Sequence, residues 1–171
     1  ASAQTTPHEQ YIALHKNVAV QEMKRSGVPA SIKLAQGLLE SNAGKSTLAK
    51  KANNHFGIMC TEDWEGEVIY MLIDNETNCY KVYNSPAESY IEQAKYLTNN
   101  TQFENLFYIE SNNYKRWAKG LEALKYSNDD NYARQLIEII ELYELDEIDK
   151  QVSLFETEDY SAVASDEPIY V

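Results

Sequence analysis

Residues 30–46 read ASIKLAQGLLESNAGKS, and this stretch decides how the rest of the sequence is interpreted. Apolar residues recur at helical spacing from position 32 to position 39, which predicts a helix with a broad apolar face. Pro29 favours a helix start because its fixed φ suits the first turn. Gly44 is expected to end the element. Glu40 therefore follows two leucines at the carboxyl end of a predicted buried helix.

Three effects would raise the pKa of Glu40 in that position. Apolar neighbours disfavour the charged form, the helix carboxyl terminus carries partial negative charge, and a nearby second acid would add to both. A carboxylic acid that stays protonated near neutral pH can protonate a departing glycosidic oxygen. The alternative is an ordinary helix-end glutamate that turns to water or pairs with a lysine, and the residues alone leave it open.

The remaining pattern is mostly helical, with one exception. Strand-forming residues near positions 68–72 and 80–83 enclose turn-like residues 74–78, which predicts a small hairpin or a three-stranded lobe. Ser85 and Glu88 form a capping-box pattern at a helix start. Trp117 is expected in the core. Further helices are predicted over residues 11–25, 46–51, 85–97, 114–124 and 132–143.

The length of 171 residues suits one compact domain, predicted at residues 10–149. Residues 1–9 are small and polar, and they are expected to be a flexible N-terminal segment. This segment fits either a mature chain that has lost its signal peptide or a plain disordered terminus. Residues 150–171 lose all amphipathic period and predict an acidic, solvated tail, with a short strand possible at residues 168–171.

The net charge of −12 argues against a nucleic-acid ligand, because such proteins use basic surfaces to contact phosphates. It argues equally against adsorption to anionic lipid. No run approaches the ~20 apolar residues of a membrane span, so no membrane insertion is expected. Three histidines and no Cys/His cluster predict no metal site and no cofactor.

Two cysteines, Cys60 and Cys79, flank the predicted hairpin. They could form one disulfide across a loop of about 19 residues, worth about 3 kcal/mol, or remain as two thiols. By themselves they are weak evidence for an oxidising compartment.

Several blocks, in order, resemble glycoside hydrolase family 73, the bacterial glucosaminidases that include flagellar peptidoglycan hydrolases. These blocks are GVPAS at 27–31, LAQGLLES at 34–41, GKSTLA at 44–49 and ANNHFGI at 52–58. Downstream, Trp64, Gly66 and CYKVY at 79–83 are similar to Bacteroidetes-type members, which carry cysteines at both points and so favour the disulfide. The resemblance covers about residues 11–149.

This resemblance implies a lysozyme-like α+β fold, mainly α, with a helical lobe, a small β-hairpin lobe and a cleft between them. It implies that Glu40 is the general acid. A second carboxylate often lies in the β-lobe of the family, where Asp74 is the first candidate and Glu76 the second. The alternative is two ordinary turn acids. An inverting enzyme needs a base ~6.5–9.5 Å from the acid, whereas a retaining enzyme can use the acetamido oxygen of its substrate.

The family's closing block, of the form Tyr-Ala-Thr-Asp-Pro-x-Tyr, matches Tyr126 and Tyr132, although SNDDN stands between them here. That departure puts the loop geometry in doubt. Tyr132 is the preferred residue to hold an acetamido group, with a core tyrosine as the alternative. The predicted substrate-binding residues are Asn53, Asn54, His55, Phe56, Trp64 and Tyr126.

The predicted protein is a secreted or periplasmic monomer that acts on the glycan strands of peptidoglycan. The predicted reaction is endo-acting cleavage of β-1,4 bonds after N-acetylglucosamine. A muramidase or a lytic transglycosylase on the same fold is one alternative. A non-catalytic peptidoglycan-binding protein is another.

Overall fold

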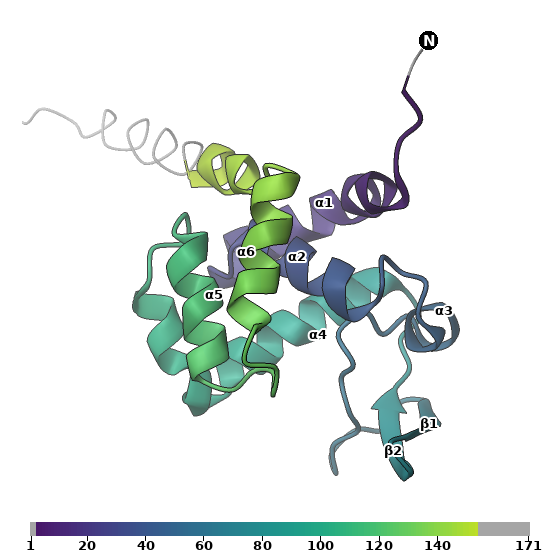
Figure 1. Cartoon of the computed structure of the whole chain (residues 1–171). Coiled ribbons are helices and arrows are strands. Elements are labelled where there is room, and N and C mark those ends of the chain that lie inside the picture. Colours follow the sequence, from purple (N-terminus) through teal and green to yellow (C-terminus); the bar gives the residue numbers. More distant parts are fainter. Residues whose placement is uncertain (1–2, 154–171) are drawn as a thin grey trace, which may run out of the picture.

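Helix α2 (Ala30–Glu40) lies at the centre of the helical lobe in this computed structural model, which describes residues 3–153. It contacts α1, α5 and α6, and every residue from Ala30 to Leu38 is buried, as the apolar pattern predicts. Figure 1 shows the other helices around it and the hairpin projecting to one side. The other elements are α1 (Pro7–Ser26), α3 (Thr47–Ala52), β1 (Val68–Ile73), β2 (Glu76–Lys81), α4 (Pro86–Asn99), the 3-10 helix η1 (Thr101–Tyr108), α5 (Tyr114–Ala123) and α6 (Tyr132–Leu142).

The start of α2 is capped by a residue from the far end of the chain. Pro29 is the N-cap and makes no side-chain cap bond. Instead, the Ser31 backbone N–H donates to Asp149 Oδ1 at 2.9 Å, and the Ser31 hydroxyl donates to the other carboxyl oxygen. Asp149 is fully buried, and this burial raises its pKa to about 7. The carboxyl group satisfies amide donors that the first turn leaves free.

At both ends, helical structure extends beyond the predicted limits of the domain, residues 10–149. Helix α1 begins at Pro7, so residues 7–9 are helical: Thr6 accepts from the Glu9 amide while the Glu9 carboxylate accepts from the Thr6 amide. At the other end, residues 150–153 of the predicted tail are helical, and Val152 belongs to the core. The possible strand at residues 168–171 lies outside the described residues.

The hairpin is a two-stranded antiparallel sheet in which Val68 pairs with Lys81 and Ile73 pairs with Glu76. Its turn is Asp74-Asn75, both at positive φ (50° and 64°), a two-residue connection that suits the twist of a hairpin. The predicted turn over residues 74–78 was therefore too long, because β2 starts at residue 76.

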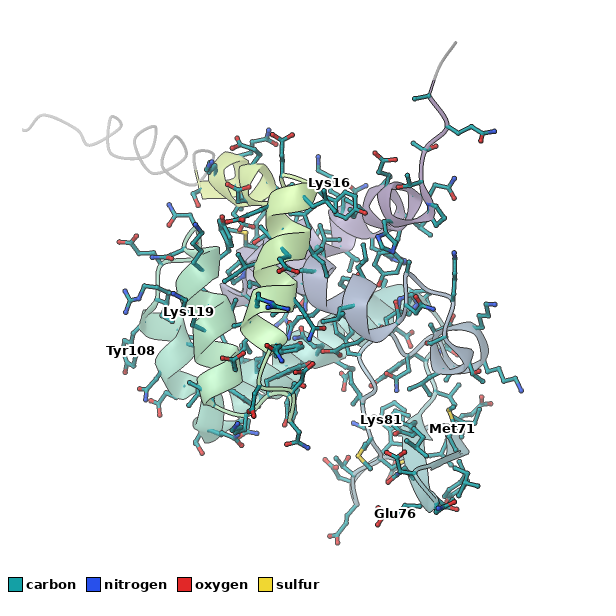
Figure 2. The ribbon with its side chains drawn as sticks, in the orientation of Figure 1. Lys16, Met71, Glu76, Lys81, Tyr108 and Lys119 are labelled. Atoms are coloured by element: carbon teal, nitrogen blue, oxygen red, sulfur yellow. A yellow bond between two sulfur atoms is a disulfide. The ribbon has the colours of Figure 1, made fainter. Side chains whose placement is uncertain are left out.

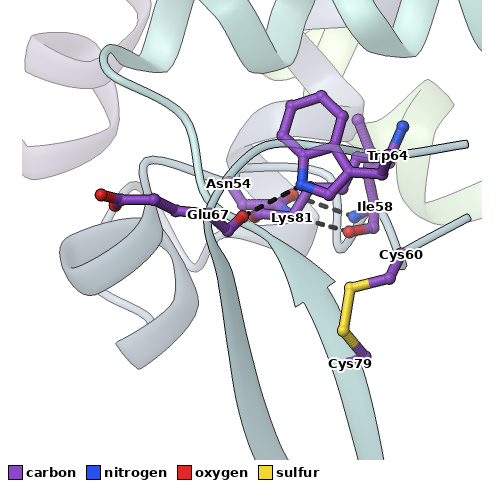
Figure 3. The surroundings of a disulfide bond; sticks show 7 residues. All are labelled: Asn54, Ile58, Cys60, Trp64, Glu67, Cys79 and Lys81. Atoms are coloured by element: carbon purple, nitrogen blue, oxygen red, sulfur yellow. Dashed lines mark hydrogen bonds between the residues drawn. A yellow bond between two sulfur atoms is a disulfide. The ribbon is translucent and has the colours of Figure 1, made fainter.

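The predicted disulfide is present. Cys60 and Cys79 are bonded, with their Cα atoms 5.4 Å apart, and the bond joins β2 to the segment that precedes the hairpin (Figure 3). Backbone bonding supports the same junction, since the Cys60 amide donates to the Cys79 carbonyl. Within residues 3–153, no helix combines the length and the apolar character needed to cross a membrane.

Candidate active site

A cavity of about 870 Å³ opens where the end of α2 meets α4, the start of α6 and the segment before the hairpin. Glu40 lies in its wall. Four elements far apart in sequence therefore form one groove, which extends toward the β-lobe through Lys81. Its other lining residues include Phe56, Ile58, Met59, Thr61, Asp63, Glu92, Gln93, Tyr96, Tyr126, Asp129, Tyr132 and Gln135.

Glu40 is the last residue of α2 and is partly buried. Burial raises the pKa of its carboxyl group to about 8, and a hydrogen bond from Tyr132 partly offsets that rise. The desolvation predicted from the sequence is the dominant cause, whereas no second carboxylate contributes to the shift. Glu40 thus holds its proton at neutral pH, which is the property a general acid needs.

A sharp helix end fixes Glu40 at this position. The Ser41 hydroxyl donates to the Gly37 carbonyl and accepts from the Gly44 amide. Asn42, Ala43 and Gly44 then follow with φ of 50°, 53° and 76°. The chain therefore turns away immediately after Glu40, which leaves the carboxyl group at the groove and not along a continuing helix.

Two tyrosines from the closing segment lie beside Glu40. The Tyr132 hydroxyl donates to Glu40 Oε1 at 2.6 Å and accepts from the Gln36 amide at 2.9 Å. The ring of Tyr126 stacks on Tyr132, with centroids 5.8 Å apart and planes 19° apart. The structure therefore brings Glu40, Tyr126 and Tyr132 together despite the unusual residues between the two tyrosines.

A buried aromatic layer lies behind this wall. The Tyr11 hydroxyl is 2.8 Å from His55 Nδ1 and 2.9 Å from the Tyr90 hydroxyl. Both hydroxyls pack closely against α2 at Gly37. A Cβ added there would lie 2.4 Å from the Tyr90 oxygen and 2.7 Å from the Tyr11 oxygen. Burial lowers the pKa of His55 to about 4. His55 is thus a neutral part of this layer and is not among the groove-lining side chains, and its contact with substrate stays a prediction.

Asn53 and Asn54, which are predicted to contact sugar, donate hydrogen bonds to backbone carbonyls. The Asn53 amide donates to the Tyr83 carbonyl. The Asn54 amide donates to the carbonyls of Ile58 and Lys81, and its oxygen accepts from the Ile58 amide. Figure 3 shows Asn54 beside Ile58 and Lys81, with the hydrogen bonds as dashed lines. The side chains hold the β-lobe to the helical lobe, and neither lines the groove.

The structure places the two remaining aromatic candidates, Phe56 and Trp64, differently. Phe56 lines the groove and packs edge-on against Tyr90, with centroids 4.8 Å apart. Trp64 does not line it. Its indole N–H donates to the Glu67 carbonyl, and Lys81 Nζ lies 4.6 Å from the ring centroid (Figure 3). Trp64 therefore supports the fold of the β-lobe.

Asp74 and Glu76 lie at the tip of the hairpin, both exposed and neither in the groove wall. Figure 2 shows Glu76 at the outer end of the hairpin and Lys81 at the end nearer the helices. The structure does not bring either acid together with Glu40, because the strands carry the tip away from the groove.

Two other acids in the groove wall, Glu92 and Asp129, have protein partners. Glu92 lies 3.0 Å from Lys95 Nζ and 3.9 Å from Lys81 Nζ. Asp129 accepts from the Asn131 amide and from the Gln135 side chain, and these bonds lower its pKa. Among residues 3–153, no group of three or more His, Cys, Asp or Glu side chains is arranged to hold a metal ion.

Residues 16–145 match the family described as glucosaminidase, mannosyl-glycoprotein endo-β-N-acetylglucosaminidase. The chain belongs to this glucosaminidase family. The predicted resemblance to glycoside hydrolase family 73 and the predicted lysozyme-like, mainly helical α+β fold are thereby confirmed. The matched region contains every side chain of the groove wall described above.

Curated relatives of this glucosaminidase-family chain are longer proteins. It is 31% identical to the exo-glucosaminidase LytG of Bacillus subtilis over 150 residues, covering 81% of this chain and 52% of LytG. It is 26% identical to the peptidoglycan hydrolase FlgJ of Pseudomonas aeruginosa, covering 77% of this chain and 36% of FlgJ. The chain therefore spans about half or less of these relatives.

Solved structures of similar domains share the fold. The catalytic domain of the autolysin Auto from Listeria monocytogenes superposes with a TM-score of 0.73 at 27% identity, covering 87% of this chain and 91% of that domain. The glycoside hydrolase domain of Salmonella typhimurium FlgJ gives a TM-score of 0.66 at 25% identity, covering 94% and 99%.

Proposed function

We propose that this glucosaminidase-family chain is a peptidoglycan hydrolase that cleaves β-1,4 bonds after N-acetylglucosamine, with Glu40 as its general acid. The observation that carries the proposal is a carboxyl group with a pKa of about 8 in the wall of a groove of about 870 Å³. Two relatives support the substrate, since one is named an exo-glucosaminidase and the other a peptidoglycan hydrolase.

In the proposed first step, protonated Glu40 donates its proton to the leaving glycosidic oxygen as the bond from that oxygen to the anomeric carbon breaks. The acetamido oxygen of the N-acetylglucosamine unit that contains this anomeric carbon attacks it and forms a cyclic oxazolinium ion. Water then attacks that carbon and gives a proton to the Glu40 carboxylate, and the ring opens. The products keep the anomeric configuration, and Glu40 regains its proton.

The substrate-assisted route is favoured over an inverting one by the other acids. Glu92 is paired with lysines, Asp129 is held by two donors, and the hairpin-tip acids lie outside the groove. Asp63 is the remaining acid of the groove wall, and a hydrogen bond from Thr61 is the main cause that lowers its pKa, which makes it a weaker base. Tyr132 supports the acid itself in this mechanism, because its hydroxyl is already bonded to Glu40 and Gln36.

The setting follows from the disulfide and the substrate. Disulfides persist in oxidising compartments, and peptidoglycan lies outside the cytoplasmic membrane. We therefore place the protein in the secreted or periplasmic space, and we propose that it acts as a monomer. The disulfide-bonded segment Ile58–Thr61 forms part of the groove wall, so oxidation would also shape the site.

The decisive experiment compares Glu40→Gln with the unmodified protein on purified sacculi. We expect the release of soluble glycan to fall about 100- to 10,000-fold, because this is the range that general acid catalysis supplies, while circular dichroism is unchanged. Glu138→Gln is the matched control, since Glu138 is an exposed glutamate on α6. Full activity in Glu40→Gln would remove the central assignment.

The products separate the alternative reactions. N-acetylglucosamine at the new reducing end, in fragments of many lengths, supports endo-acting cleavage, whereas single sugars released from strand ends would indicate exo-action. Muramic acid at that end would instead identify a muramidase, and an anhydro-muramic end a lytic transglycosylase. Saturable binding to sacculi by the unmodified protein, with no sugar released, would identify a non-catalytic binding protein.

A further inference from the structure

Lys33 is a fully buried cation in the middle of α2. Its Nζ donates to the Tyr90 carbonyl at 2.7 Å and to Gln93 Oε1 at 2.5 Å. It also lies 5.5 Å from the ring centroid of Phe56 and 5.7 Å from that of Tyr90. No salt bridge to Lys33 is present among residues 3–153. A buried charge without an ion partner is expensive to maintain, so its presence calls for a reason.

The bond to Gln93 is the first of four hydrogen bonds that end at the acid. Gln93 Nε2 donates to Gln36 Oε1 at 2.8 Å, and Gln36 Nε2 donates to the Tyr132 hydroxyl at 2.9 Å. The Tyr132 hydroxyl donates to Glu40 Oε1 at 2.6 Å. We name these five residues the Lys33 relay. Its first four side chains are at most 3% exposed, so water does not compete for their bonds.

The direction of the relay is set at its Lys33 end. An ammonium group only donates, so Gln93 must turn its carbonyl oxygen toward Lys33 and its amide hydrogens toward Gln36. Gln36 must then accept with its own oxygen and donate to Tyr132. The Tyr132 oxygen accepts that bond, and its single hydrogen is left for Glu40. With no cation at one end, two amides and a phenol could be bonded in either direction.

We propose that Lys33, through Gln93 and Gln36, is a positioning residue that obliges Tyr132 to donate to Glu40 Oε1 and so holds the acidic proton of Glu40 on Oε2. This inference rests on the proposed function of Glu40 as the acid. Oε2 has no protein partner among the described residues, and a proton held there is available to a substrate oxygen. In the reverse direction, Glu40 would donate its proton to Tyr132, away from the substrate.

The charge of Lys33 also strengthens the last bond. Hydrogen bonds in a series polarise one another, and a cation at the donor end makes each later donor stronger. Burial lowers the pKa of Lys33 to about 7, with Glu22 opposing this change and Arg25 adding to it. Kinetic comparisons therefore belong at pH 6, where the ammonium form prevails.

The first test is Lys33→Met, which keeps the length of the side chain and removes the charge. We expect a folded protein of somewhat lower thermal stability, because the Tyr90 carbonyl and Gln93 Oε1 lose their donor, which outweighs the gain from removing a buried charge. With soluble glycan strands at pH 6, kcat should fall about tenfold or more while KM stays within about twofold. Lys119→Met is the matched control, because Lys119 is exposed on α5 (Figure 2) and does not line the groove.

Gln36→Glu is a second variant, and it reverses the hydrogen bond between residue 36 and Tyr132. A carboxylate at position 36 accepts from both Gln93 and Tyr132, so the phenol no longer donates to Glu40. We expect a larger loss of kcat than in Lys33→Met. Both variants should move the ¹³C titration midpoint of the Glu40 carboxyl upward, because its charged form loses a polarised donor. The missing signal in Glu40→Gln assigns that resonance.

The direction of these hydrogen bonds can also be measured in the unmodified protein. The relay predicts nuclear Overhauser contacts between the side-chain amide hydrogens of Gln36 and the Tyr132 ring, whereas the reverse direction would place those hydrogens against Gln93.

The outcomes separate the relay from the proposed function. A folded Lys33→Met protein with unchanged kcat and an unchanged Glu40 titration would overturn the relay, as would Gln36 amide hydrogens facing Gln93. Full activity in Glu40→Gln would contradict the function of the site, yet the titration of Glu40 in Lys33→Met would still support or refute the relay.

Discussion

The Tyr132 hydroxyl donates a 2.6 Å hydrogen bond to Glu40 Oε1, across 92 positions of sequence. One residue begins α6 and the other ends α2, and these helices pack against each other. The carboxyl group is thus oriented by a tertiary contact and not by its own helix. Any change that shifts α6 relative to α2 will change the acid as well.

Tyr132→Phe tests that contact. The variant removes the donor to Glu40 and leaves a buried Gln36 amide hydrogen without a partner, so we expect kcat to fall about 10- to 100-fold and the free energy of unfolding to fall by about 1–3 kcal/mol. Tyr114→Phe is the matched control, because that tyrosine also donates to a glutamate, Glu141, but lies outside the groove. Equal kinetics of the two variants would contradict a role for Tyr132 in supporting the acid.

The raised pKa of Glu40 sets the pH dependence of activity. Catalysis requires the protonated form, so kcat/KM should be sustained through neutral pH and decline as the pH rises through about 8. A pH–rate profile on soluble glycan strands measures this. A decline that begins near pH 4.5, the ordinary pKa of a glutamate, would show that burial does not raise the pKa of Glu40.

The same group affects stability in a defined direction. The folded-state pKa lies above the unfolded value of 4.5, so the unfolded chain releases this proton first as the pH rises. Glu40 therefore destabilises the folded protein increasingly between pH 4.5 and about 8. Denaturant unfolding of Glu40→Gln should match the unmodified protein at pH 4 and exceed its stability by a growing margin up to pH 8. A constant difference across that range would contradict the shift.

The hairpin-tip acids provide a test of mechanism. Because Asp74 and Glu76 lie outside the groove, the Asp74→Asn/Glu76→Gln double variant should keep its kcat within about threefold of the unmodified value. Analysis of the first-formed anomer should show retention. A loss of about 100-fold or more, together with an inverted anomer, would instead assign a base to the tip and require the hairpin to close over the groove.

The disulfide is expected to stabilise the β-lobe. Its loop of 19 residues corresponds to about 3 kcal/mol in the chain-entropy estimate. The Cys60→Ser/Cys79→Ser variant should unfold at lower denaturant concentration and bind glycan more weakly, because this segment forms part of the groove wall. Helical circular dichroism should be kept. An unchanged unfolding midpoint would show that the other β-lobe contacts suffice.

Asp149 is expected to matter for stability and not for chemistry. Asp149→Ala leaves the Ser31 amide and hydroxyl without an acceptor, which should cost about 2–3 kcal/mol in the free energy of unfolding. Asp149→Asn keeps one acceptor oxygen and should lose about 1 kcal/mol or less. Urea titrations give both values. Equal losses in the two variants would show that charge, and not hydrogen bonding, holds the start of α2.

Local patterns made most of the fold predictable. Helical spacing located α2 and α6, and strand propensity located the hairpin. The start of α1 was missed although Thr6, Pro7 and Glu9 form a recognisable capping pattern. The predicted capping box at Ser85 is different in the structure, where the Glu88 carboxylate accepts from the Asn84 amide and Ser85 makes no side-chain cap bond. The 3-10 helix η1 was not predicted, because its short repeat leaves little periodic signal.

The candidate site was predictable only in part. Its position at the end of an apolar helix identified Glu40 as a candidate acid. The resemblance to the family identified Tyr126 and Tyr132. Lys33 and Gln36 gave no signal, because a lysine and a glutamine in a helix are usually solvated. Their burial results from the packing of α4 and α6 on α2, which no local pattern encodes. The backbone bonds of Asn54 were not predictable, because an amide that bonds to backbone looks, in sequence, like one that binds sugar.

Gly37 marks a limit for engineering this domain. Replacing a helical glycine with alanine is a routine way to raise thermal tolerance, since it restricts the unfolded chain. At this position the methyl group would displace two phenols that pack directly beneath the acid's helix. A stabilisation campaign that scans helices for glycines would therefore have to leave this one alone and seek its gains on the outer surface of the domain.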